Sequence, residues 1–600
     1  MFQRLYDRYK RIIELVIYPI ILLILPLINY DQGVDISDST YSLGNYMFAD
    51  RLDGMWVIST FLSNMIGSII LKLPGAHQLR FANIYTGLVL SAIVLIVYFV
   101  LKDDLGAKSV FIGEFVAVCF CWIPTGILYN YLSYLFMVMG ALLLYKGIVK
   151  DDQKLFFLAG IILGANVFVR IPNITQMALI VVLWVWGIIY KKRVVKKTLV
   201  CIAGYALGLV ICIATIIATF GLVGLSDMIL GLAGITSTDE SYTALAMITG
   251  TLKDYIRSSK WFVVILTVLA VGVLIFTLVE KVILSRYAGE ENSTYKTVMF
   301  VSAGCFFMAV IAVMLRFFWG RGMFSFRYYE DYTSMYEWGM VALIASLITD
   351  VYVIIHSAKN KNDNKYEKIL LLAVISLVII MIAPLGSNNH TYQNLNNLFL
   401  VLPVTVKICF DSINRFYVMR RNKDKKGTTI GLPFSVMAYS LIVVILIQSY
   451  GFHLEFVFRD GMRGEKRDYQ VERINSLKGM YTNKENAEEI FKICSLIEEK
   501  SPDELILYGN CPGLVYVTGI PCAMSSSWPD LDSNPLSMIK DDLDRIVGRL
   551  DDNYTIVAVV RKNEQLSEAY SMKREILEKF LYDQKFDLVM KDEEFSIYER

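Results

Sequence analysis

The chain has 600 residues, of which 55% are hydrophobic and only 19% are charged, and its mean hydropathy is +0.49. These values exclude an ordinary soluble globular protein, because apolar runs of about 18 residues or more recur along the chain. The formal net charge of +2 is too balanced for a nucleic-acid-binding protein. We therefore expect a mostly α-helical, polytopic membrane protein.

The chain begins with a short basic segment followed by a long apolar run. Arg4, Arg8, Lys10 and Arg11 precede the run, and no small-residue cleavage site follows it. We expect an uncleaved first span in the cell membrane, with the N-terminus in the cytoplasm.

Apolar runs of spanning length recur as far as residue 450. By the criterion of roughly 20 residues per span, we expect a helical bundle of about 13 spans. They lie near residues 12–29, 79–101, 110–129, 131–149, 155–170, 174–190, 198–222, 261–280, 297–318, 336–356, 369–385, 396–412 and 430–450.

The run Trp56–Leu73 is ambiguous, because several polar residues interrupt it. If it does not span, the large basic clusters at Lys191–Lys197, Lys359–Lys368 and Lys407–Lys426 all lie in cytoplasmic loops. If it spans, they all lie outside. The positive-inside rule therefore predicts that Trp56–Leu73 is an interfacial helix on the outer surface, within a first outside loop of residues 30–78.

The composition changes after residue 452, where polar residues become frequent. We expect two domains, a membrane domain of residues 1–452 and a small extracytoplasmic α/β domain of residues 453–600. Expected helices at Lys484–Lys500, Leu536–Leu550 and Glu564–Phe580 alternate with expected strands at Glu504–Tyr508, Thr555–Val560, Phe586–Met590 and Phe595–Tyr598. This domain carries no nucleotide-binding or hydrolase motif, which favours a binding or scaffolding role.

The first outside loop is the candidate active-site loop. It contains Asp35, Asp38 and Tyr41, and Asp38 comes three residues before Tyr41 at the start of a helical pattern. A solvated acidic loop is the plain alternative. The next expected element is the interfacial helix, which favours a site against the membrane surface.

Other outside segments carry candidate binding residues. Arg170 ends an apolar run, where it is either a helix anchor or a bidentate ligand of a lipid phosphate. Arg321 and Arg327 lie in an aromatic-rich segment, which is either an aromatic belt or a rim that binds sugar and phosphate. The amide-rich loop suits sugar hydroxyls but also ordinary turns; its candidates are Asn388, Asn389 and His390.

With these residues the chain resembles the GT-C superfamily, the polytopic glycosyltransferases that use polyprenyl-phosphate sugars. It looks most like the branch of protein O-mannosyltransferases and aminoarabinose transferases. In that branch the first outside loop carries an acidic residue, an aromatic residue a few positions later and two helices along the membrane. Asp38, Tyr41 and Trp56–Leu73 fit this pattern.

The resemblance implies a glycosyltransferase that moves a sugar from a polyprenyl-phosphate donor to a glycan, lipid or protein acceptor on the extracytoplasmic face. Asp38, or else Asp35, would be the catalytic base, and Tyr41 a substrate contact. The phosphate would be held by Arg170 with Arg321 or Arg327. The partners expected are the donor, the acceptor and membrane lipids.

Two departures from the family pattern are visible. Asp35 and Asp38 are spaced rather than adjacent, which leaves the choice of base open. Asn130 stands where several relatives have a carboxylate, so we expect no metal and no cofactor.

Two other functions stay open. A transporter or flippase of lipid-linked sugars would carry ionisable residues deep in its spans, and Glu114 and Asp350 are the candidates. A polysaccharide polymerase would also act on the outer face, but the C-terminal domain argues mildly against it.

Overall fold

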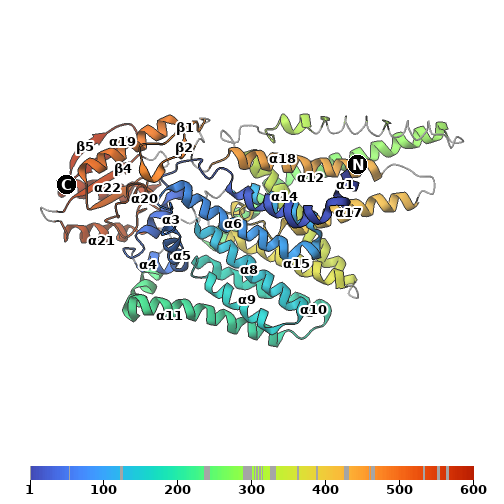
Figure 1. Cartoon of the computed structure of the whole chain (residues 1–600), viewed down its shortest axis with the longest axis horizontal. Coiled ribbons are helices and arrows are strands. Elements are labelled where there is room, and N and C mark those ends of the chain that lie inside the picture. The colour runs from blue at the N-terminus through green and yellow to red at the C-terminus, as the bar shows by residue number, and fades with distance from the viewer. Residues whose placement is uncertain are drawn as a thin grey trace.

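Helices make up most of the computed structural model of the chain (Figure 1). The structure describes all residues except 1, 53, 122–125, 127, 235–242, 288–300, 303–304, 306–308, 310–311, 314, 325–332, 361–363, 387–388, 424–430, 458–459, 461–465, 532–533, 551–553 and 563–566. The expected fold class, a helical membrane bundle with a small C-terminal α/β part, is confirmed.

In the described part of the chain, seven helical segments are long and apolar enough to cross a membrane. They are Leu79–Phe120, Leu128–Lys150, Ile171–Tyr190, Val195–Leu232, Leu245–Gly272, Ser334–Lys359 and Tyr366–Gly386. The first of these holds two expected spans, because Gly106 has a φ of 87° and separates α6 from α7. A left-handed backbone of this kind suits glycine, and here it marks the turn between two packed helices.

Fifteen helical segments of the described chain belong to the bundle or lead into it. Their bounds are α1 (Phe2–Ile12), η1 (Ile13–Ile17), α2 (Tyr18–Ile24), α6 (Leu79–Leu101), α7 (Ala107–Phe120), α8 (Leu128–Lys150), α9 (Gln153–Asn166), η4 (Ile171–Ile180), α10 (Val181–Tyr190), α11 (Val195–Gly234), α12 (Ala244–Tyr287), α14 (Thr333–Lys359), α15 (Asn364–Ile382), α17 (Leu402–Lys423) and α18 (Gly431–Glu455).

The helices differ from the expected spans in several regions, and the expected spans 12–29 and 396–412 are not among the seven spanning segments. The expected spans at 155–170 and 430–450 correspond to the shorter apolar helices Gln153–Asn166 and Ile442–Glu455, while much of 297–318 lies outside the described residues. The segment between the expected spans 198–222 and 261–280 is helical at both ends. Helix α11 continues past a kink at Gly221, and α12 begins at Ala244.

Trp56–Leu73 forms short helices rather than one long one. Helices α3 (Asp38–Met47), α4 (Gly54–Ser59) and α5 (Phe61–Leu71) lie at the end of the bundle that carries the C-terminal part (Figure 1). The contact between α3 and α5 is close, because a Cβ on Gly67 would come within 2.4 Å of the Tyr46 ring. Ser68 also donates a hydrogen bond of 2.7 Å to the Tyr46 carbonyl. These contacts hold α5 beside α3.

The C-terminal part is a four-stranded mixed sheet with helices around it. Strands β3 (Glu504–Tyr508), β4 (Ile556–Arg561), β5 (Asp587–Lys591) and β6 (Phe595–Glu599) lie in the order β3-β4-β6-β5, with only β3 and β4 parallel. The helices are α19 (Lys484–Lys500), α20 (Leu514–Thr518), α21 (Leu536–Val547) and α22 (Glu568–Asp583), and a small ribbon pairs β1 (Tyr469–Gln470) with β2 (Tyr481–Thr482). The helices and strands alternate as expected. Strands β3 and β4 are continuous apolar runs, which is typical of strands that are buried on both faces of a sheet.

One hydrophobic cluster joins the C-terminal part to the bundle. It contains Leu43 and Tyr46 of α3, Leu132 of α8, Tyr516 of α20 and Val557 of β4, all nearly inaccessible to solvent. Burial of apolar surface is favourable by about 25 cal/mol per Å². We call this cluster the shared core, because α3 and α8 of the bundle and α20 and β4 of the C-terminal part all contribute buried side chains to it.

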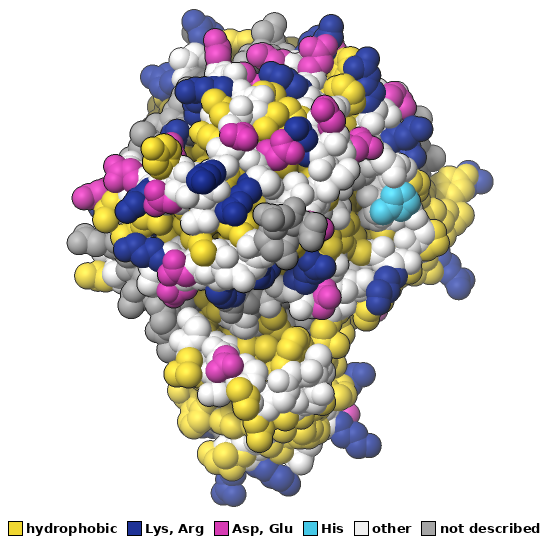
Figure 2. Space-filling model, turned by 90° about the vertical axis from the view of Figure 1, so that its left-hand side faces the viewer, with side chains coloured by type: hydrophobic (Ala, Val, Ile, Leu, Met, Phe, Trp, Pro, Cys, Tyr) yellow, Lys and Arg dark blue, Asp and Glu magenta, His cyan; other side chains and the backbone are white. Residues whose placement is uncertain are grey.

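The surface at the end of the molecule that carries the C-terminal part has a charged region and an apolar region. Figure 2 shows Lys and Arg side chains interspersed with Asp and Glu over its upper part, and a largely hydrophobic lower part. On the last part of α11, Leu222 and Val223 are 70% and 76% exposed. Contiguous exposed apolar side chains of this kind suit contact with lipid.

Candidate functional site

Asp35 lies three residues before helix α3 and accepts hydrogen bonds at its start. Its carboxylate accepts hydrogen bonds from the backbone N–H groups of Ser37, at 2.9 Å, and Ser39, at 3.0 Å, and from both of their hydroxyls. Its carbonyl accepts the Thr40 hydroxyl at 2.8 Å. The N–H groups of a first helical turn lack partners within the helix, so a side chain that accepts them stabilises the helix start. This bonding favours a structural role for Asp35 and leaves Asp38 as the better candidate base.

Asp38 is the first residue of α3 and is half-buried. It interacts electrostatically with the hydroxyls of Tyr41 and Tyr129. Burial raises the pKa of Tyr41, so its hydroxyl stays protonated at neutral pH. The carboxylate therefore lies within electrostatic reach of two phenol groups.

Tyr41 belongs to an aromatic cluster to which the C-terminal part contributes. Its ring lies 5.4 Å from that of Trp528 and 6.4 Å from that of Trp56, both near edge-on. Gly513 makes this approach possible, because its N–H donates to the Ile36 carbonyl at 2.7 Å and a Cβ there would lie 1.7 Å from the Thr40 hydroxyl. The segment after β3 is thus seated on the candidate active-site loop.

Arg170 lines a polar cavity of about 50 Å³, which is room for a few water molecules. It follows α9 and precedes η4, and its guanidinium donates to the Gly386 carbonyl at 3.4 Å. The same guanidinium lies 5.7 Å from the centre of the Tyr129 ring. Tyr129 therefore links the two charged groups, because it interacts with both Arg170 and Asp38.

Amide side chains make up much of the cavity wall. Asn173 donates to the Ser133 hydroxyl at 2.9 Å, which fixes one side of the wall. On the other side Asn397 has a buried carbonyl oxygen with no partner among the described atoms. An unpaired buried acceptor costs about 1–3 kcal/mol, so it favours a bound water or a ligand hydroxyl. The polar residues of the wall are Asn130, Ser133, Asn173, Thr175, Gln176, Gln393 and Asn397, and Arg170 is its charged residue.

Some of the remaining predicted site residues lie near the cavity and others do not. Asn389 and His390 directly precede α16 (Thr391–Leu395), whose Gln393 reaches the cavity. The His390 ring packs on α12, where a Cβ on Gly250 would come within 2.2 Å of it. Arg321 stacks on the ring of Phe317 at 3.6 Å and is not among the described residues that line the cavity. Arg327 and Asn388 lie outside the described residues.

Sequence reasoning missed most of the cavity wall. Asn173 and Gln176 interrupt an apolar run, which is a recognisable signal for a polar site in a membrane helix. Gln393 and Asn397 follow the predicted amide-rich loop by only a few residues. Trp528 carried no signal, because only the folding of the C-terminal part brings it to Tyr41.

Comparison with known proteins gives similarity in fold alone. No protein-family model and no curated protein sequence matches the chain. One similar structure is ArnT from Cupriavidus metallidurans bound to undecaprenyl phosphate, with 9% identity, 98% of this chain and 97% of that chain covered, and a TM-score of 0.46. Another is the Archaeoglobus fulgidus oligosaccharyltransferase in the apo form, with 12% identity, 93% and 70% covered, and a TM-score of 0.46.

The same oligosaccharyltransferase in complex with zinc and sulfate has 11% identity, 91% and 68% covered, and a TM-score of 0.44. Matches at these identities and TM-scores transfer no residue role and no substrate to this chain.

Proposed function

We propose that the protein is a membrane glycosyltransferase that moves a sugar from a polyprenyl-phosphate donor to a glycan, lipid or protein acceptor. The observation that carries this proposal is the arrangement of Asp38 and Arg170 around Tyr129. It supplies a carboxylate, a guanidinium and amide side chains at one end of a membrane bundle. We further propose that this end is extracytoplasmic, because the large basic clusters of the sequence belong to the opposite end.

The reaction needs a base and a cation. The acceptor hydroxyl attacks the anomeric carbon, a new C–O bond forms, and the bond to the phosphate oxygen breaks. Asp38 takes the proton of the hydroxyl, while the polyprenyl phosphate leaves with the additional negative charge. Arg170 stabilises that charge through charge-assisted hydrogen bonds, which are strong where water is excluded. A single displacement of this kind inverts the anomeric centre.

The amide wall would form hydrogen bonds with hydroxyls of the sugar. Asn130, Gln393 and Asn397 present donors and acceptors that match sugar hydroxyls. The unpaired carbonyl oxygen of Asn397 supports this role, because a sugar hydroxyl would satisfy it. Tyr41, with Trp528 and Trp56 against its ring, would flank the acceptor beside Asp38.

One observation favours the alternative of a lipid-linked sugar transporter. Glu114 on α7 is fully buried, and neither of its carboxyl oxygens has a hydrogen-bond partner among the described atoms. An ionisable residue inside a membrane bundle is often part of a transport or proton path. The glycosyltransferase is preferred because Arg170 and the amide side chains of the cavity lie beside Tyr129, which also interacts with Asp38.

The variant Arg170→Lys tests the phosphate site. Lysine keeps the positive charge but lacks the planar fork that binds phosphate with two hydrogen bonds. We expect the affinity of the purified protein for undecaprenyl phosphate to fall roughly tenfold, which corresponds to about 1.4 kcal/mol. Isothermal titration calorimetry in detergent measures this affinity.

Arg321→Lys is the matched control, because Arg321 stacks on Phe317 away from the cavity wall. It should bind the lipid as the wild type does. Wild-type affinity in Arg170→Lys would mean that Arg170 only anchors its helix, and the proposed donor site would be wrong.

A further inference from the structure

A chain of hydrogen bonds links the start of α16 to two long helices of the bundle. Thr391, the first residue of α16, is fully buried, and its hydroxyl donates to the Asp254 carboxylate of α12 at 2.8 Å. The Tyr336 hydroxyl of α14 lies 2.7 Å from the same Thr391 oxygen. Because the Thr391 proton is directed to Asp254, Tyr336 is the donor to Thr391. We call Tyr336, Thr391 and Asp254 the α16 anchor.

A second contact with α12 holds the same point of the chain. His390, directly before Thr391, has a φ of 47°, which a residue with a side chain keeps only where neighbouring groups fix it. Its ring packs on Gly250, where a Cβ would come within 2.2 Å of it. Gly250 lies one helical turn before Asp254, whose side chain is only 18% exposed. The start of α16 is therefore held by two successive turns of α12.

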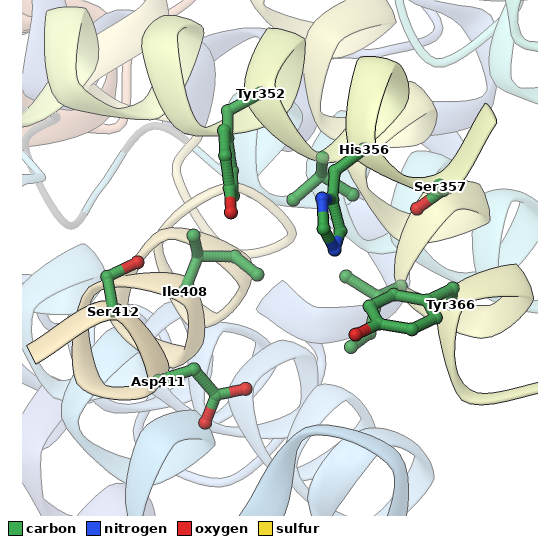
Figure 3. Close-up of a pocket in the computed structure, with 9 residues that line it drawn as sticks. Tyr352, His356, Ser357, Tyr366, Ile408, Asp411 and Ser412 are labelled. Carbon is green, nitrogen blue, oxygen red and sulfur yellow. The ribbon is translucent and has the colours of Figure 1, made fainter. Parts of the chain in front are cut away.

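Helix α14, which supplies Tyr336 to the anchor, is itself held against α15 at two levels. Near its middle, Asp350 accepts a hydrogen bond of 2.6 Å from the Ser376 hydroxyl of α15. Near its end, the His356 ring stacks on Tyr352 at 5.6 Å and meets Tyr366 of α15 edge-on at 5.1 Å (Figure 3). The anchor therefore ties α16 to a helix that is fixed by its own packing.

The α16 anchor leads directly to the amide wall of the candidate site. Gln393 comes two residues after Thr391 and Asn397 six residues after it, and both line the cavity together with Arg170. The Asn397 N–H donates to the Asn394 carbonyl at 3.0 Å, so the chain stays in hydrogen-bonded turns as far as Asn397. A displacement of Thr391 would therefore move both amides relative to the Arg170 guanidinium.

We propose that Thr391 and Asp254 are positioning residues for the donor sugar. By fixing the start of α16, they hold the amides of Gln393 and Asn397 at the distance from Arg170 that a sugar phosphate spans. Hydrogen bonds weaken steeply when their distance or angle changes, so a shifted wall loses affinity for the sugar rather than for the phosphate. The inference rests on the proposed function, because it assigns the amide wall to the sugar.

Hydrogen exchange in the purified full-length protein tests the anchor without reference to activity. Thr391→Val keeps the shape of the side chain but removes the hydroxyl, whereas Thr391→Ser keeps the hydroxyl. We expect the amide protons of residues 393–397 to exchange roughly tenfold faster in Thr391→Val and at the wild-type rate in Thr391→Ser. Unchanged exchange in Thr391→Val would refute the anchor.

Thr249→Val is the matched control for both measurements. Thr249 is an exposed threonine of α12, and its hydroxyl donates to the Leu245 carbonyl of the same helix at 2.9 Å. It loses a hydroxyl as Thr391→Val does, but from a side chain that is not part of the anchor. We expect wild-type exchange and wild-type kinetics from this variant.

Steady-state kinetics tests the role of the anchor in sugar binding. The probes are undecaprenyl phosphates that carry one hexose or pentose, and the donor used is one that the wild type transfers. We expect Thr391→Val and Asp254→Ala to raise the KM for this donor roughly tenfold, the effect of losing about one hydrogen bond. The kcat and the affinity for bare undecaprenyl phosphate should change little, and Thr391→Ser should restore the wild-type KM.

The possible failures of this experiment have different meanings. A purely structural role would lower kcat through loss of folded protein and leave KM unchanged, and that result overturns the positioning role. A wild type that transfers none of the sugars would instead refute the proposed function, and the exchange measurement would still decide whether the anchor holds α16.

Discussion

At the residue scale, Asp35 and Asp38 have different roles although they are only three positions apart. Both carboxylate oxygens of Asp35 accept hydrogen bonds at the start of α3, whereas Asp38 interacts electrostatically with Tyr41 and Tyr129. A carboxylate that already accepts four hydrogen bonds is a poor proton acceptor for a substrate. The choice between them depends on side-chain directions that the spacing in the sequence does not determine.

The variant Asp38→Asn tests the proposed base. Asparagine keeps the shape and hydrogen bonding of the side chain but cannot accept the proton of the acceptor hydroxyl. We expect turnover to fall by roughly 10²–10⁴-fold, with the affinity for undecaprenyl phosphate little changed. A transfer assay with the purified protein and a polyprenyl-phosphate sugar measures the first, and calorimetry measures the second.

Asp50→Asn is the control for this variant, because Asp50 is an exposed carboxylate in the same loop. It should leave turnover unchanged. Asp35→Asn is less suitable, since a loss of activity there would follow from disruption of α3. A fully active Asp38→Asn protein would remove Asp38 from the mechanism.

At the element scale, the first outside segment is tied to the C-terminal part through Asp460. The Asp460 carboxylate accepts the Val34 N–H at 2.6 Å and the Thr482 hydroxyl at 3.0 Å. Burial raises the pKa of Asp460 to about 6 from an ordinary value of 3.8. The folded protein therefore keeps this proton at pH values where the unfolded chain has released it.

This shift predicts a stability that depends on pH. Between about pH 4 and pH 6 the folded state binds one more proton than the unfolded state, so the contribution of Asp460 to stability decreases as the pH rises. The total change is about 3 kcal/mol by pH 7. We expect Asp460→Asn to lack this decrease, so that the variant gains on the wild type as the pH rises. Thermal unfolding of the two proteins at pH 4.5 and pH 7 measures the difference.

The neighbouring exposed residue provides the comparison. Asp468→Asn should follow the wild-type pH profile, because Asp468 is solvent-exposed. Parallel profiles for wild type and Asp460→Asn would show that Asp460 does not hold its proton in the folded protein.

The sequence predicts helices and strands better than it predicts the tertiary contacts between them. The alternation of apolar runs and turns was sufficient for β3 to β6 and for most bundle helices, because local hydropathy governs their burial. It was insufficient between the expected spans 198–222 and 261–280, where α11 continues to Gly234 and α12 begins at Ala244. In the site, Arg170 was recognisable at the end of an apolar run. Tyr129 and Asn397 were not, since they reach Arg170 only through tertiary packing.

At the scale of the whole molecule, the orientation in the membrane remains a prediction. It depends on the positive-inside rule and on Trp56–Leu73 not crossing the bilayer. We expect Lys478→Cys, in the C-terminal part, to react with an impermeant thiol reagent in intact cells, and Arg193→Cys, in the turn between α10 and α11, to be protected. Both positions are exposed in the structure.

Labelling after the cells are opened is the control, because both cysteines should then react. A cysteine-depleted background is needed, since Cys305 is itself exposed. Reaction of Arg193→Cys alone in intact cells would invert the proposed orientation and place the candidate site in the cytoplasm.

The shared core also determines when helix α3 can pack against the C-terminal part during synthesis. Helix α3 is made long before β6, which pairs with β4 and contributes Phe595 and Ile597 to the shared core. At 5–20 residues per second, about 550 residues and roughly 30 s to 2 min separate the two. The candidate active-site loop therefore waits on the membrane without its partner for most of translation. A chain that is released before the C-terminal part is made contains Asp38 and Arg170 but lacks the C-terminal surface that packs on α3. Such a chain therefore cannot form the complete candidate site.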